Sequence, residues 1–244
     1  MTVFVSPLKH HFLILLLFLI LPHAAVFAGD ADLHGFLATY SVRTAGLKVG
    51  RMQRRLTITS GNHYRFESKI ESTGLLALVH KATIEESSEG ELSPTQLLPQ
   101  HYVYRRSTGD KRKEASTDFD WARSRVTMRA KNQQWEIATR PGTLDKLVYQ
   151  LALMRDLARG DDDRLHYTIA DDGELKIYDL TRAGLETIEI NGEAVPAQKI
   201  VYARNGSTRK TTLWCAAAYG YLPIKIEYLE RDGGLTVATL TAFQ

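Results

Sequence analysis

Apolar and polar residues alternate along most of the chain, between short segments rich in Gly, Asn and Asp. In residues 63–70, Tyr64, Phe66 and Ile70 share one side of an extended chain with Ser68, and charged residues occupy the other side. A period of two is typical of strands in a sheet with one buried and one hydrated face. Strands are predicted at residues 54–60, 63–70, 165–170, 175–180, 186–190, 196–202, 209–215, 222–230 and 235–243.

Turn residues separate these predicted strands at short intervals. The clearest are Asn191-Gly192 and Asn205-Gly206, because a two-residue hairpin turn needs positive φ at both central positions. Asp172-Gly173 has the same character, as do the segments at residues 60–62 and 232–234. This pattern predicts an antiparallel meander.

One segment, residues 143–160, has a helical period instead. Thr143 is the predicted N-cap, Asp145 lies in the predicted first turn, and Gly160 is the predicted stop. The apolar positions on one face are Leu144, Leu147, Val148, Leu151, Met154 and Leu157 or Ala158. Residues 73–80 are ambiguous between a helical turn and a strand.

The predicted fold is mainly β, with one main α-helix. A large one-faced antiparallel sheet and a single amphipathic helix must bury their apolar faces together, so we expect a curved sheet, an open or partly closed barrel, that wraps the helix. Residues 29–244 are expected to form one domain, with sheet halves at 29–140 and 161–244 on either side of the helix. Such a wrap leaves space at its open edge, where apolar ligands often bind.

The first 28 residues have the pattern of a cleaved signal peptide. Lys9 precedes an uncharged apolar run at residues 12–21, and residues 26–28 are Val-Phe-Ala. The run is shorter than the roughly 20 apolar residues that span a bilayer. We expect a mature protein that begins near Gly29, resides in the periplasm and does not span the membrane; because residue 29 is not Cys, no lipid anchor is expected.

Charge and cysteine content narrow the class of protein. Without the predicted signal peptide, which holds Lys9 and no acidic residue, the formal charge falls from +3 to +2. A net charge this close to zero gives no positive electrostatic field strong enough to attract nucleic acid. Cys215, the one cysteine of the sequence, is flanked by apolar residues, which favours a small buried hydrophobe over a reactive thiol and leaves no partner for an internal disulfide.

The polar residues of the sequence form no recognised catalytic or metal-binding pattern. The histidines of the mature chain lack the spacing of metal ligands, and the acidic run at residues 161–163 lacks the Gly and distal Glu of a helix-loop-helix calcium site. No nucleophile elbow or phosphate-binding glycine loop occurs in the sequence. The sequence therefore predicts no metal, no cofactor and no enzymatic activity.

The helix and one sheet segment supply a candidate ligand site. An apolar or lipid-like ligand held between helix and sheet is the first hypothesis; the alternative, a filled core made of the same side chains, stays open. The candidate lining residues are Tyr64, Phe66, Leu147, Val148, Leu151 and Met154.

A basic hairpin supplies a second candidate site. Five cations flank one predicted turn: Arg105, Arg106, Lys111, Arg112 and Lys113. Charges of this kind on an edge strand commonly prevent aggregation, and they also suit an anionic envelope surface. An envelope protein that binds a partner through this hairpin, without a small ligand, is the alternative function.

The chain also resembles a known family. Residues 143–160, the segment Leu213-Trp214-Cys215-Ala216 and residues 221–227 are similar to an exported bacterial family known as domain of unknown function 3108, and residues 40–50 and 97–102 fit its N-terminal half. The resemblance implies an architecture like that of periplasmic lipoprotein carriers, in which an incomplete barrel wraps a helix and shields an acyl chain. It implies no active site, because that family has none established, and Cys215 stands where an apolar residue is expected.

Overall fold

The computed structural model describes residues 33–59, 61–74, 77, 81–93, 95–160, 164–203 and 208–244. The predicted signal peptide, the Asn205-Gly206 turn and the acidic run at 161–163 lie outside the described residues, as does most of the ambiguous segment at 73–80. No helix in the described ranges is long and apolar enough to cross a membrane.

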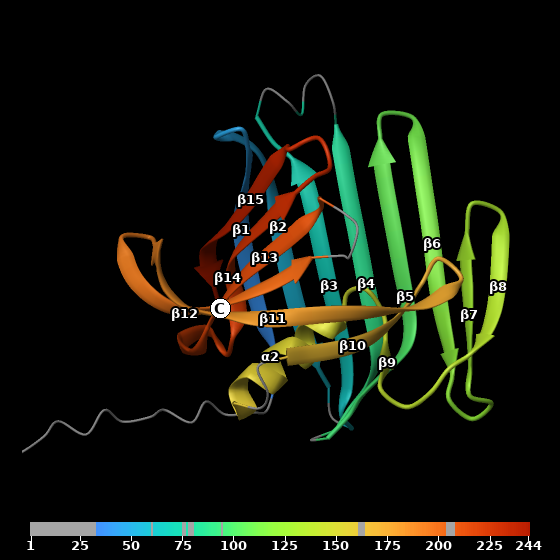
Figure 1. Cartoon of the computed structure of the whole chain (residues 1–244). Helices are drawn as coiled ribbons and strands as arrows, with labels where there is room; N and C mark the ends of the chain where they lie inside the picture. The colour runs from blue at the N-terminus through green and yellow to red at the C-terminus, as the bar shows by residue number, and fades with distance from the viewer. Residues whose placement is uncertain are drawn as a thin grey trace, which may run out of the picture.

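The described chain forms one 15-stranded sheet with a single α-helix, α2, against its inner face (Figure 1). The strands of the first half are β1 (Phe36–Thr44), β2 (Leu47–Ile58), β3 (His63–Ser72), β4 (Ala82–Leu92), β5 (Leu97–Thr108), β6 (Lys111–Asp120), β7 (Arg125–Ala130) and β8 (Gln133–Ala138). They are followed by β9 (Thr143–Leu144), α2 (Tyr149–Arg159), β10 (Arg164–Asp171), β11 (Glu174–Ile190), β12 (Glu193–Ala203), β13 (Lys210–Ala216), the short 3-10 helix η1 (Ala217–Tyr219), β14 (Leu222–Leu229) and β15 (Leu235–Phe243).

The first and last strands pair with each other in the middle of the sheet. The strand order runs from β8 to β1, continues through β15 to β10, and ends at β9. The β1–β15 pairing is antiparallel, with Val42 opposite Ala238. Because this pairing joins strands about 200 residues apart in sequence, the two halves of the chain share one sheet and one main core.

The sheet curls without closing, so its two ends overlap instead of pairing. β8 and β9 are the two edge strands, and the β9–β10 end lies inside the β5–β8 end. A second core cluster fixes this overlap, with Phe119, Val126 and Met128 from β6 and β7 packed against Ala170 of β10. The predicted mainly-β fold with a curved sheet that wraps one helix is therefore confirmed, in its open form.

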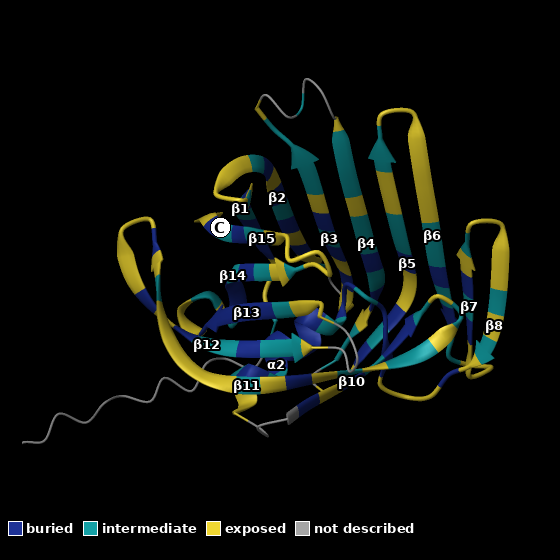
Figure 2. Cartoon of the chain, turned by 45° about the horizontal axis from the view of Figure 1, so that its top comes forward, coloured by how far each residue is buried: buried dark blue, intermediate teal, exposed yellow. Residues whose placement is uncertain are grey.

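The alternation in the sequence corresponds to burial in the structure. In β3, Tyr64, Phe66 and Ser68 are buried and the residues between them are half-buried or exposed. Figure 2 shows the buried residues on the inner face around α2 and the exposed residues at the hairpin tips. The predicted strands at 175–180 and 186–190 form a single 17-residue strand, β11, which bends at a bulge between Arg182 and Leu185.

The hairpin turns follow their sequence signals. Asn191 and Gly192 have φ angles of 53° and 86°, and they join β11 to β12 as the predicted two-residue turn. Asp172 and Gly173 join β10 to β11 in the same way, with φ angles of 51° and 82°. At Gly173 a Cβ atom would also lie 2.7 Å from ring atoms of Trp135, so this turn packs closely on β8.

The helix begins later than its sequence pattern predicts. Residues 143 and 144 form β9, which pairs in parallel with β10, and the N-cap assignment of Thr143 is wrong. The Thr143 hydroxyl donates to the Arg140 carbonyl at 2.8 Å, whereas the Asp145 carboxylate accepts the first free amides of the helical turn. The helix ends as predicted, with Gly160 in the left-handed conformation at φ 78°.

Candidate functional site

A buried polar cluster connects the start of the helix to the sheet. One oxygen of Asp145 accepts the amide hydrogens of Leu147 and Val148, both at 2.8 Å, and its other oxygen accepts the Ser88 hydroxyl at 2.6 Å. The Tyr64 hydroxyl lies 3.1 Å from the Ser88 oxygen. Burial raises the pKa of Asp145 to about 6, although the hydrogen bonds from Ser88 and the amides oppose the rise. Because Asp145 is 0% exposed, this cluster positions the helix and offers no surface to a substrate.

A second polar group lies beside this cluster on the inner face. Lys146 binds Asp171 at 2.8 Å, and Lys176 binds the other oxygen of the same carboxylate at 2.6 Å. Burial alone would raise the pKa of Asp171, but the two ammonium groups outweigh it and hold that pKa below its usual range. The Lys146 ammonium also lies 5.5 Å from the centre of the Tyr104 ring. These contacts fasten the β10–β11 hairpin to the helix start.

The six predicted ligand-lining residues lie together in the main core. Each is at most 4% exposed, and all belong to one packed cluster between α2 and the sheet: Tyr64, Phe66, Leu147, Val148, Leu151 and Met154. Side chains packed in this way leave no room for a ligand unless the core rearranges. The packing favours the filled-core alternative for the space directly between helix and sheet.

An apolar pocket opens at one end of this core, and Met154 is one of its lining residues. We name it the end pocket; its volume is about 350 Å³, and it is lined by Leu33, His34, Gly35, Phe36, Met154, Ala217, Ala218, Tyr219, Gly220, Tyr221, Phe243 and Gln244. Phe243 stacks on Phe36 at 6.0 Å between ring centres and meets Tyr219 edge-on at 5.3 Å. Because Phe243 is still 39% exposed, the pocket presents aromatic surface to solvent.

Backbone pairing positions the walls of the end pocket. Leu37 and Gln244 exchange both of their backbone hydrogen bonds, at 2.8 and 3.0 Å, and this holds the end of β15 beside the start of β1. On the opposite side, η1 is followed by two successive residues with positive φ, Gly220 and Tyr221. Four segments far apart in sequence therefore meet here: the start of β1, α2, η1 with its turn, and the end of β15.

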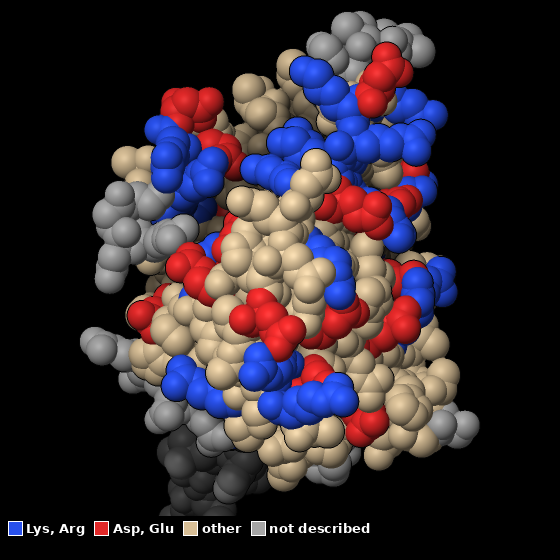
Figure 3. All heavy atoms as spheres, turned by 90° about the vertical axis from the view of Figure 1, so that its right-hand side faces the viewer, with Lys and Arg blue, Asp and Glu red and all other residues tan. Residues whose placement is uncertain are grey.

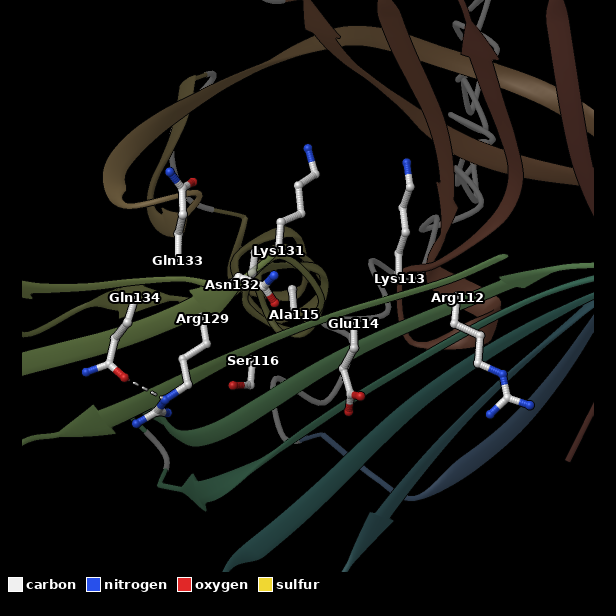
Figure 4. Close-up of a pocket in the computed structure, with 11 residues that line it drawn as sticks. Arg112, Lys113, Glu114, Ala115, Ser116, Arg129, Lys131, Asn132, Gln133 and Gln134 are labelled. Carbon is white, nitrogen blue, oxygen red and sulfur yellow. Dashed lines mark hydrogen bonds between the residues drawn. The ribbon is translucent and has the colours of Figure 1, made fainter. Parts of the chain in front are cut away.

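A larger and more polar hollow lies at the rim of the sheet (Figure 4). We name it the rim notch; its volume is about 610 Å³, and it is lined by residues 112–116 of β6 and residues 129–134 at the tip of the β7–β8 hairpin. β7 pairs with β6 only from Ala115 onward, so the first four residues of β6 extend beyond their neighbour. Lys113, Lys131 and Gln133 point to one side of the sheet, and Arg112, Glu114 and Arg129 point to the other.

Positive charge is concentrated at this rim. Figure 3 shows Lys and Arg side chains gathered at the top of the face formed by β6–β8, above a region of mixed charge. Arg106 lies directly opposite Lys113 in the β5–β6 register, an arrangement of like charges that is unfavourable unless something neutralises them. Within the part of the chain that the structure describes, neither residue has a carboxylate within 4.0 Å, and the same holds for Arg112 and Lys131.

The five cations of the predicted basic hairpin differ in their surroundings in the structure. Arg105 is paired with Glu114 at 2.9 Å, and Arg112 and Lys113 line the rim notch. Arg129 and Lys131, which belong to the next hairpin, complete the notch. A sequence signal for them exists in the Arg-Ala-Lys run at 129–131, but only the strand pairing brings it beside the first hairpin.

The sequence matches a known protein family over most of its length. A family model described as "Protein of unknown function (DUF3108)" matches residues 39–241. The chain belongs to the DUF3108 family. The match extends from β1 to β15, so it includes both halves of the sheet and confirms the resemblance seen in the sequence.

A solved structure has the same fold as this DUF3108 protein. It is the "Crystal Structure of Beta-barrel-like Protein of Domain of Unknown Function DUF1849 from Brucella abortus", with 7% sequence identity and a TM-score of 0.57. The alignment covers 86% of this chain and 97% of the other. Comparison with curated proteins finds no match. At this identity the similarity establishes a barrel-like fold and carries no function with it.

The histidines and the cysteine of the DUF3108 chain occupy separate places. His101 lies 2.6 Å from Asp118 on the outer face, and His166 is hydrogen-bonded to Asp179 on another strand pair. Among the described residues, no three His, Cys, Asp or Glu side chains gather where they could hold a metal ion. Cys215 is buried, and burial raises the pKa of its thiol, as expected of a small core residue.

Proposed function

We propose that this DUF3108 protein is an exported, non-catalytic binding protein of the cell envelope that holds an apolar, lipid-like ligand in the end pocket. The observation that carries the proposal is a hollow of about 350 Å³ walled by Phe36, Met154, Tyr219, Tyr221 and Phe243. Ligand pockets in proteins have volumes of about 300–1,000 Å³ and mostly apolar walls with a few polar groups. His34 and Gln244 are the polar side chains at this pocket.

The end pocket is a different site from the one that the sequence pattern predicts, which lies directly between helix and sheet. Leu147, Val148 and Leu151 fill the space between helix and sheet, so a ligand there would have to displace core side chains. Met154, near the other end of the helix, lies at the boundary between this core and the end pocket. A ligand in the end pocket would contact the helix through Met154 and leave the core intact.

The N-terminal sequence pattern supports the assignment to the envelope. The basic residue, apolar run and small residues of positions 1–28 form the pattern that a signal peptidase recognises. N-terminal sequencing of the protein recovered from the periplasm is expected to begin near Gly29. Recovery of the unprocessed chain from the cytoplasm would contradict this placement.

Blocking the end pocket tests the ligand proposal. Ala218 is exposed and lines the pocket, so Ala218→Trp should fill the hollow without disturbing the core. Ala122→Trp is the matched control, because Ala122 is an exposed alanine in the β6–β7 turn, away from the pocket. Mass spectrometry of protein purified from the periplasm should detect lipid in the wild type and in the control, and much less in Ala218→Trp. Absence of lipid from the wild type, or equal lipid in all three proteins, would rule the proposal out.

A second candidate function is supported by the rim notch. The opposed Arg106 and Lys113, with Lys131 nearby, form a cationic surface that suits an acidic segment of an envelope protein. Replacing Arg112, Lys113 and Lys131 by Gln should abolish recovery of such a partner from envelope extracts. The control variant Arg65→Gln/Lys69→Gln removes cations that are already paired with carboxylates, and it should retain the partner. Unchanged recovery with the notch variant would reject this function.

A further inference from the structure

An arginine is buried in the main core without an acidic partner. Arg54 of β2 points inward between Ala38 of β1 and Ser68 of β3, and it is 3% exposed. Its Nε and Nη1 atoms are buried and have no hydrogen-bond partner. Moving a charged group out of water is strongly unfavourable unless an opposite charge and hydrogen bonds compensate for the lost hydration. The fold therefore keeps a cation with two of its three guanidinium nitrogens unpaired.

The groups around Arg54 are neutral. Its guanidinium carbon lies 5.8 Å from the centre of the Tyr40 ring, and its charge also acts on Tyr149, Tyr228 and Cys215. The Tyr40 hydroxyl donates to the Pro223 carbonyl at 3.0 Å, so its proton is already engaged. A cation–π contact and phenol oxygens stabilise a guanidinium but do not balance its charge.

No carboxylate among the described residues lies within 4.0 Å of the Arg54 nitrogens. The next inward-facing acid in the sheet register is Glu86 of β4, which lies beyond Ser68. That carboxylate accepts the Tyr102 hydroxyl at 2.6 Å. An anion that comes from outside the chain could satisfy Arg54 without disrupting an existing ion pair.

Tyr228 is a partly exposed residue whose side chain lies near Arg54. Tyr228 of β14 is on the same face of its strand as the buried Ile224 and Ile226, yet 37% of it is exposed. Burial raises the pKa of Tyr228, and the positive charge of Arg54 opposes that rise, so the phenol lies within electrostatic reach of the guanidinium. Tyr228 also lines a pocket of about 210 Å³, together with Tyr202, Lys210, Arg231 and the ion pair of Arg209 with Glu230 at 3.1 Å. Solvent thus reaches a residue close to the buried guanidinium.

We propose that Arg54 is the recognition group for an oxyanion, the carboxylate or phosphate of a ligand that enters past Tyr228. Guanidinium groups bind carboxylates and phosphates through charge-assisted hydrogen bonds, and two nitrogens of Arg54 are available for them. Lys210 and Arg231 at this pocket attract the anion, and movement of the Tyr228 side chain opens the way to the guanidinium. This inference goes beyond the proposed function and does not depend on it, because Arg54 is not part of the end pocket.

Titration of the purified protein with defined anions tests this inference. The probes are inorganic phosphate, octyl phosphate and the neutral octanol, each followed by isothermal titration calorimetry. Octyl phosphate is expected to bind the wild type, and Arg54→Met should weaken this binding about tenfold or more, because charge-assisted hydrogen bonds are lost. Weak binding of octanol should be unaffected by Arg54→Met. Binding of inorganic phosphate as well would identify a free anion as a sufficient ligand, and binding of octyl phosphate alone would identify an anionic amphiphile.

Two controls keep the test decisive. Arg155→Met removes another largely buried arginine, one that already donates to the Ser93 carbonyl at 3.3 Å, and it should leave anion binding unchanged. If Arg54→Met does not fold, the Nε–H resonance of Arg54 in the wild type, assigned with Arg54→Lys, should shift on addition of octyl phosphate. Failure of the wild type to bind either anion, equal binding by Arg54→Met, or an unchanged Arg54 resonance would overturn the proposal. Blocking the end pocket with Ala218→Trp should not alter anion binding, so the two proposals can fail separately.

Discussion

Replacement of Asp145 should change how the stability of the protein depends on pH. The carboxyl group has an ordinary pKa of 3.8, and burial raises it to about 6 in the folded protein. One pH unit between the folded and unfolded pKa values corresponds to about 1.4 kcal/mol. Keeping Asp145 ionised in the core at pH 7 therefore reduces stability by about 3 kcal/mol relative to its protonated form at pH below 4.

The direction of this pH dependence follows from which state of the protein binds the proton on Asp145 more tightly. Between about pH 4 and pH 6 the folded protein holds a proton on Asp145 that the unfolded chain has released, so stability falls as pH rises through this range. Asp145→Asn has no such proton, and its amide oxygen can still accept the Leu147 and Val148 amides. The asparagine variant should therefore gain about 3 kcal/mol relative to the wild type between pH 4 and pH 7.

Urea denaturation at pH 4, 5, 6 and 7 measures this change. The difference between wild type and Asp145→Asn is the quantity to compare, because it removes the contributions of other carboxyl groups such as Asp171. Asp145→Ala should be destabilised most at pH 4, because it leaves the Ser88 hydroxyl and two amides without their acceptor, and its deficit should shrink by about 3 kcal/mol by pH 7, because it too lacks the titrating carboxyl group. A difference between wild type and Asp145→Asn that stays constant from pH 4 to pH 7 would refute the reasoning.

Two further predictions concern the packing of the sheet. Gly173→Ala should destabilise the protein by about 3 kcal/mol in urea denaturation, because of its positive φ and because the new Cβ would contact Trp135. Gly192→Ala is the control: Gly192 also has a positive φ but has open space around it, so this variant should lose only about 1 kcal/mol of stability. Equal losses in the two variants would show that the Trp135 contact is unimportant. The Cys215 thiol should not react with a thiol reagent in the native protein and should react fully in urea, since burial raises its pKa and blocks access; rapid native reaction would contradict its place in the core.

Local patterns in the sequence were reliable guides to the secondary structure. Alternation at Tyr64, Phe66 and Ser68 identified the buried face of a strand, and the helical period from Leu147 to Leu157 identified the buried face of α2. Asn191-Gly192 marked a turn because its conformation depends on two adjacent residues. Thr143 failed as a cap because a competing contact, the parallel pairing with Thr168, is not visible in the local sequence.

The candidate sites were less accessible to sequence reasoning. Arg54 lies on the same buried face of β2 as Met52 and Leu56. From the sequence alone, an arginine at such a position suggests that the predicted strand register is wrong, and only the structure shows that the side chain points inward. The predicted ligand-lining residues had the right chemistry for an apolar site, yet whether they enclose a cavity or fill it depends on the distance between helix and sheet. That distance is decided by how far the sheet curls.

The sequence by itself determined the strands, the helix face, the principal turns and the family, because each depends on residues that are neighbours along the chain or share a short repeating pattern. Tertiary structure decided the rest. The β1–β15 pairing, the overlap of β10 with β6–β8, the end pocket and the rim notch all bring together segments far apart in sequence. Such contacts depend on the curvature and register of the whole sheet, which no single segment encodes.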